Sequence, residues 1–90
     1  MQPCERDKKD IFNETFGKIL TKLQNENKLS ARAISYGIDI SKTTFLLAKN
    51  GQLNPQMITF CKLAEAFNLK PSQLLKMIED ELPKNWNFCD

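Results

Sequence analysis

The stretch from Leu29 to Pro55 constrains the fold more than any other part of the chain. It contains two short amphipathic patterns, 31–38 and 42–49, and a serine stands directly before each. A serine oxygen can accept hydrogen bonds from the free N–H groups of a helix's first turn, so we expect Ser30 and Ser41 to be N-caps. The stretch therefore predicts two short helices joined by a tight turn.

The position of that turn follows from which side chains can be buried. A turn at Gly37 would bury the charged Arg32 without a partner. A turn at Asp39 puts the small Ser35 where the two helices touch, and the other inward positions are all apolar. These positions are Ile34, Ile38, Ile40, Phe45 and Ala48. The turn needs one residue in the left-handed backbone conformation, and aspartate tolerates this conformation less well than glycine. We interpret the stretch as a helix-turn-helix with its corner at Asp39 and its second helix ending at Asn50-Gly51.

In this register the stretch resembles the helix-turn-helix of the Cro and phage-repressor family, the XRE-type regulators. The resemblance covers about residues 14–80. It rests on Leu29-Ser30, Ile34, Ile40-Ser41, Phe45, Gly51, Asn54-Pro55 and the continuation NPQMITFCKLAEAFNLKPSQLL. It implies an all-α, five-helix lambda-repressor-like DNA-binding domain. The function that it implies is sequence-specific binding of double-stranded DNA by a transcriptional regulator.

The other helices follow from apolar spacing. The first spans roughly Asp10 to Asn25, and its apolar face consists of Phe12, Phe16, Ile19, Leu20 and Leu23. The polar residues QNENK then form a connection. We expect Asn54 to cap the fourth helix and Pro55 to open it. Its predicted core residues are Ile58, Cys61, Leu63, Ala64 and Phe67.

The end of the domain is less regular. Asn68 is a residue that tolerates the left-handed region, and the fifth helix begins near Pro71 with Leu74, Leu75 and Ile78 on it. Lys70 cannot accept a bond as its N-cap, so Ser72 is the substitute. The predicted organisation is an N-terminal arm (1–9), a helix-turn-helix domain (10–82) and a C-terminal tail (83–90).

Composition narrows the class of protein. Ninety residues with 41% apolar and 27% charged side chains suit one globular domain. No run approaches the roughly 20 apolar residues of a membrane span, and MQPCERDKKD lacks the apolar core of a signal peptide. We expect a cytoplasmic protein without a membrane partner. Cys4, Cys61 and Cys89 are widely spaced and are interpreted as reduced thiols.

Catalysis and cofactor binding are not expected. The chain has no histidine, no glycine-rich phosphate loop and no acid pair set against a nucleophile. Without histidine or a C-x-x-C pair there is no plausible zinc site either. The sequence thus predicts a protein that is not an enzyme and that uses no metal or small-molecule cofactor.

The net charge is only +2, but basic residues gather around the helix-turn-helix. Residues 18–62 hold seven basic side chains and only two acidic ones, whereas the flanking segments are slightly acidic. The seven are Lys18, Lys22, Lys28, Arg32, Lys42, Lys49 and Lys62. This excess is compatible with a nucleic-acid partner, and an ordinary solvated surface is the alternative explanation.

Candidate DNA contacts come from the second helix of the motif and its surroundings. The resemblance implies that Lys42, Thr43 and Leu47 reach base edges. The candidates for the DNA backbone are Lys22, Arg32, Ser41, Thr44, Lys49, Asn50, Gln52 and Asn54. Two departures from the family stand out: Ala31 replaces a common glutamine, with Arg32 beside it, and Leu46 and Leu47 are apolar where polar residues are common.

Two questions stay open at this point. The Leu46/Leu47 face is either partly core or the interface of a protein-docking module of the same fold, such as an antitoxin or accessory regulator. A single domain covers few base pairs, so we expect a homodimer on half-sites ~34 Å apart. Leu82, Trp86 and Phe88 are candidates for its interface, and packing of the tail on its own domain, or disorder, are the alternatives.

Overall fold

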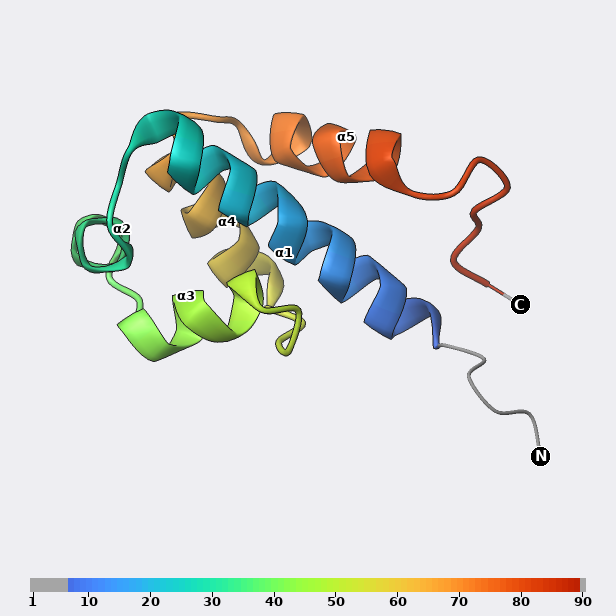
Figure 1. The fold of residues 1–90 in the computed structure, drawn as a ribbon, viewed down its shortest axis with the longest axis horizontal. Coiled ribbons are helices and arrows are strands. Elements are labelled where there is room, and N and C mark those ends of the chain that lie inside the picture. The colour runs from blue at the N-terminus through green and yellow to red at the C-terminus, as the bar shows by residue number, and fades with distance from the viewer. Residues whose placement is uncertain (1–6, 90) are drawn as a thin grey trace.

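The computed structural model describes residues 7–89, and over this range the chain forms five α-helices and no strand (Figure 1). They are α1 (Lys8–Asn27), α2 (Ala31–Ile38), α3 (Lys42–Lys49), α4 (Met57–Ala66) and α5 (Pro71–Glu81). The long α1 runs through the molecule, and α3 and α5 both pack against it. The short α2 packs on α3 and α4. The all-α prediction is confirmed.

All five helices contribute to one core. The largest fully buried side chains are Phe16, Phe45, Leu20, Leu63, Leu74 and Ile78. Ile34 adds the contribution of α2. Within the described range, no helix is both long and apolar enough to span a bilayer.

The helix-turn-helix forms in the predicted register. Ser30 Oγ accepts from the Ala33 N–H at 3.0 Å, and Asp39 lies in the left-handed region with φ 58° and ψ 47°. Ser35 is buried where the helices meet, and its hydroxyl donates to the Ala31 carbonyl oxygen at 2.9 Å. Local hydrogen bonding therefore satisfies the cap and the small polar residue at the crossing.

The first helix is longer than predicted at both ends. Asp7 caps it, and its carboxylate accepts from the Lys9 N–H at 3.4 Å. At the other end the helix includes most of QNENK and stops at Lys28, which is left-handed with φ 54°. The polar connection predicted at 24–28 is thus mostly helix. Of the predicted arm 1–9, residues 1–6, with Cys4, lie outside the described range.

The start of α4 was predicted wrongly. Asn54 does not cap the helix, because it lies two residues before the N-cap position; its side-chain Nδ2 donates instead to Asn13 Oδ1 at 2.7 Å. The helix begins at Met57 instead, after Gln56, whose side chain makes no capping bond. A partner on α1 has therefore replaced the expected local role of Asn54.

The predicted core face of α4 also needs one correction. Ile58 is 65% exposed, because the buried Leu63, Ala64 and Phe67 lie on the opposite side of the helix. Phe60 stands three, four and seven residues before those three, which places it on their face. Its ring packs 5.4 Å from that of Phe16. Phe60 therefore takes the inward position predicted for Ile58, and Cys61 is half-buried with a free thiol.

The start of α5 agrees with the sequence except at its cap. Asn68 is left-handed with φ 61°, and α5 begins at Pro71. Gln73 Oε1 accepts from the Lys70 N–H at 2.8 Å, so Gln73 and not Ser72 satisfies the first turn. A side chain at the third helical position commonly reaches back in this way.

The tail after α5 folds back onto the beginning of α1. Leu82 is only 8% exposed and belongs to the core, so its assignment to a dimer surface is wrong. Trp86 is half-buried against the same core. Lys8 Nζ donates to Asn87 Oδ1 at 2.7 Å and to the Cys89 carbonyl oxygen at 2.8 Å.

Aromatic contacts complete this end of the molecule. The Phe88 ring lies 5.9 Å from that of Phe12 and 5.5 Å from that of Trp86, while Phe88 itself stays 60% exposed. Lys8 Nζ lies 5.8 Å from the centre of the Trp86 ring. In the structure the tail therefore packs on its own domain, which was one of the alternatives.

Candidate nucleic-acid interface

Helix α3 has one face in the core and the other in solvent. Phe45 and Ala48 are fully buried, while Lys42 and Thr43 are exposed and Leu47 is 37% exposed. The three base-edge candidates therefore share the solvent side of a helix whose other side is held by packing. A short helix anchored in this way can enter a groove without leaving its domain.

The two neighbouring leucines of α3, Leu46 and Leu47, differ in their exposure to solvent. Leu46 packs against the core, and only Leu47 is exposed. Leu46 is thus partly buried against the core without being one of its fully buried residues. Of the Leu46/Leu47 face, Leu47 therefore offers the larger exposed apolar surface.

The beginning of α3 is capped through two hydroxyls. Ser41 Oγ accepts from the Thr44 N–H at 3.0 Å, and the two hydroxyl oxygens lie 2.8 Å apart. Each hydroxyl carries one proton, and their mutual bond uses only one of the two. One proton of the pair thus stays available for an acceptor outside the protein, such as a phosphate oxygen.

An open groove of about 420 Å³ separates α2 from the start of α3. Arg32 and Lys42 line it from the two helices, together with Tyr36, which is 92% exposed. The structure thus brings a backbone candidate and a base-edge candidate to one groove. Tyr36 was not predicted as part of the site, although its spacing of four residues from Arg32 places both on one helical face.

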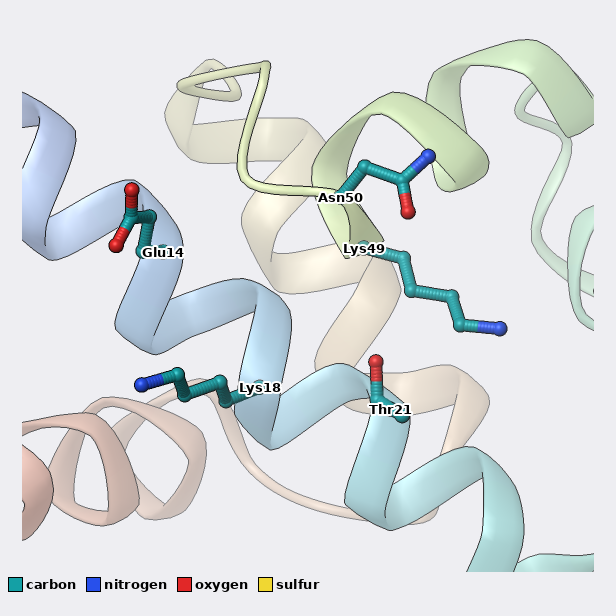
Figure 2. Close-up of a pocket in the computed structure, with 5 residues that line it drawn as sticks. All are labelled: Glu14, Lys18, Thr21, Lys49 and Asn50. Atoms are coloured by element: carbon teal, nitrogen blue, oxygen red, sulfur yellow. The ribbon is translucent and has the colours of Figure 1, made fainter.

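A second open cleft, of about 370 Å³, lies between α1 and the end of α3 (Figure 2). Its lining residues are Glu14, Lys18, Thr21, Lys49 and Asn50. In Figure 2 the side chains of Lys18 and Lys49 extend in opposite directions, and the Thr21 hydroxyl points toward α3. The cleft unites the predicted Lys49 and Asn50 with Lys18 and Thr21, which were not predicted as contacts.

Lys22 is placed differently from the other candidates. It lines a third groove, between α1 and α5, together with Lys18 and Glu81. The structure therefore places Lys22 in the groove toward α5 rather than in the Lys49 cleft, and Lys18 lines both.

The end of α3 is seated on α1 through Gly17. A Cβ atom at this position would clash with the Lys49 carbonyl oxygen and lie 3.1 Å from both the Ala48 carbonyl oxygen and the Gly51 nitrogen. Only a glycine lets the two backbones approach so closely. Gly17 stands within the apolar spacing of the first helix, and sequence reasoning did not single it out.

The loop after α3 holds the remaining backbone candidates. Gly51 is left-handed with φ 76°, and the Gln52 N–H donates to the Leu47 carbonyl oxygen at 2.9 Å. Gln52 is exposed. Asn54 uses one amide proton for Asn13, as described above. Asn13 was also missed, although it stands four positions before Gly17 and therefore lies on the same face of α1.

The helix order and the α2–α3 corner define a helix-turn-helix fold. A solved structure with this fold is that of the restriction-modification controller protein C.AhdI from Aeromonas hydrophila. Its TM-score with this chain is 0.65 at 24% sequence identity, and the match covers 69% of this chain and 94% of that one. At this identity the likeness establishes the fold alone.

Sequence comparison finds a different relative. The Type II methyltransferase M.Sau96I from Staphylococcus aureus is 28% identical over 72 residues, which are 80% of this chain. The match spans only 17% of the length of that methyltransferase. No family model matches the chain.

Proposed function

We propose that this protein is a sequence-specific double-stranded DNA-binding transcriptional regulator that places α3 in the major groove. The observation that carries the proposal is the division of α3, with Phe45 and Ala48 buried and Lys42, Thr43 and Leu47 in solvent. The major groove admits an α-helix, and its base edges can be read by such side chains.

Each base-edge candidate has a chemistry that suits a base. The Lys42 ammonium can donate to O6 or N7 of guanine. Thr43 can bond polar base edges or contact a thymine methyl group, and Leu47 can contact that methyl group only.

The backbone candidates flank α3 on both sides. Arg32 approaches from the α2 groove, and Lys49 and Asn50 approach from the α1 cleft. The Ser41–Thr44 pair retains one hydroxyl proton, and Gln52 is exposed in the following loop. We assign Lys22 and Asn54 supporting roles, because Lys22 lines the groove between α1 and α5 rather than a groove at α3, and Asn54 already bonds α1.

The likeness to C.AhdI supports regulation rather than catalysis, since that protein is a restriction-modification controller. A regulator of this kind acts in the cytoplasm, and we propose that location. We also propose that two copies bind half-sites ~34 Å apart. Their contact surface excludes Leu82, which is buried in the core.

Selection from a library of random duplexes, followed by a salt series, tests the proposal. We expect an enriched palindromic site and an affinity that falls steeply with salt, because phosphate neutralisation releases counterions. Arg32→Ala should reduce the salt slope by about one. Lys76→Ala is the matched control, because Lys76 is an exposed lysine of α5 that pairs with Asp80 at 3.6 Å. Absence of duplex binding at low salt would overturn the proposal and favour the protein-docking alternative.

A further inference from the structure

We propose that Asn13, a buried side chain of α1, positions the DNA contacts that follow α3 by holding Asn54. The inference rests on the proposed function, because it concerns how the loop at 50–56 meets DNA. Asn13 is a positioning residue in this account and touches no DNA itself.

The bond between the two side chains joins distant parts of the chain. Asn13 is 5% exposed, and its Oδ1 accepts from Asn54 Nδ2 at 2.7 Å, across 41 positions of sequence. A buried amide oxygen without a partner is costly, so Asn13 favours the loop conformation that brings Asn54 to it. The bond therefore selects one path for the loop.

The loop is held at both ends. At its beginning, the N–H groups of Gly51 and Gln52 donate to carbonyl oxygens of α3, at 3.1 Å and 2.9 Å. A Cβ atom on Gly51 would lie 3.2 Å from the Glu14 Cα, so the loop also lies directly against α1. At its other end Asn54 bonds Asn13, and the preceding Leu53 packs against the core.

Asn50 and Gln52, two backbone candidates, are presented by this held segment. Both side chains are exposed. Without the Asn13–Asn54 bond the loop would have more conformations, and DNA binding would have to order it at the cost of affinity. Since phosphates carry no base information, the loss should be the same for every sequence.

A double-mutant cycle measured on duplex DNA tests the inference. Asn13→Ala, Asn54→Ala and the double variant are compared with the wild type on the selected site, at a low temperature where circular dichroism shows each to be folded. We expect each single variant to bind about fivefold more weakly and the double variant to bind no more weakly than either, because both remove one bond. The base-preference profile should stay unchanged.

Two controls separate positioning from general stability. Gln56→Ala changes an exposed side chain of the same loop that makes no capping bond, and it should bind like the wild type. Ile78→Val removes a methyl group from a fully buried side chain of α5, so it should lower the melting temperature without weakening binding.

The possible results are distinct. Loss of affinity in Asn54→Ala but not in Asn13→Ala would mean that Asn54 contacts DNA directly, which overturns the positioning role. Unchanged affinity in both variants, or losses that multiply in the double variant, would overturn it as well and leave the proposed function standing. A wild type that binds no duplex would defeat the proposed function and the inference together.

Discussion

The region 29–51 and the region 52–89 differ in where their polar groups find partners. In the first region the bonds are local: Ser30 accepts from the Ala33 N–H and Ser41 from the Thr44 N–H. In the second, the Lys70 N–H has a local partner in Gln73 Oε1, but Asn54 bonds Asn13, and Lys8 donates to Asn87 across 79 positions. The first region formed in the predicted register, and the prediction errors in α4 and the tail lie in the second. The two serine caps could be predicted from neighbouring residues, whereas a distant partner exists only after folding, and the local partner Gln73 was also missed.

The largest loss of stability is expected from substitution of Gly17, the residue of α1 against which the end of the first region packs. Gly17→Ala puts a Cβ atom against the backbone of Lys49, which cannot move without shifting α3, so we expect a loss of about 2–3 kcal/mol. Urea unfolding measures this loss as a lower midpoint urea concentration at an unchanged m-value. Gly37→Ala is the control, because no atom lies within 4 Å of its Cβ position, and it should stabilise the protein by about 0.5 kcal/mol. Equal stabilities of the two variants would contradict the close backbone contact between Gly17 and the end of α3.

Removal of the tail tests the second region. Deletion of residues 83–90 exposes core surface that Trp86 covers, and we expect it to cost about 1–2 kcal/mol without changing the association state. Urea unfolding and sedimentation measure the two quantities. Trp86→Ala should reproduce most of the loss, and Lys84→Ala, at an exposed tail position, should not. A truncated protein of normal stability that dissociates into monomers would instead support a dimer role for the tail.

The corner at Asp39 should show a small effect of opposite sign. Asp39→Gly relieves the left-handed conformation of a residue with a Cβ atom, and we expect a gain of about 0.5–1 kcal/mol. The same substitution at Asp80, inside α5, should destabilise the protein because glycine is a poor helix former. Thermal unfolding compares the melting temperatures of the two variants. A destabilised Asp39→Gly variant would show that the aspartate side chain stabilises the fold by more than its left-handed backbone strain costs.

The sequence predicted the fold and the helix-turn-helix register because caps, a left-handed turn residue and apolar spacing are local properties. It also placed Lys42, Thr43 and Leu47 on the exposed face of the second helix, but it put Leu46 there too, which packs against the core. It did not predict Gly17, because the closeness of α1 to the end of α3 is a tertiary fact. The clustering of Lys18 and Thr21 with Lys49 was missed for the same reason. The DNA roles of these side chains stay predictions.

The central claim is that α3 reads bases from its solvent face while its end contacts phosphates. The most direct test is a base-preference profile of Lys42→Ala and Lys49→Ala on the selected duplex. We expect Lys42→Ala to relax preference at one position of each half-site and to lose about 1–3 kcal/mol there, because a direct base contact is removed. Lys49→Ala should weaken all sequences equally. Identical profiles for the two variants would contradict the division of α3 into a base-reading face and a phosphate-contacting end.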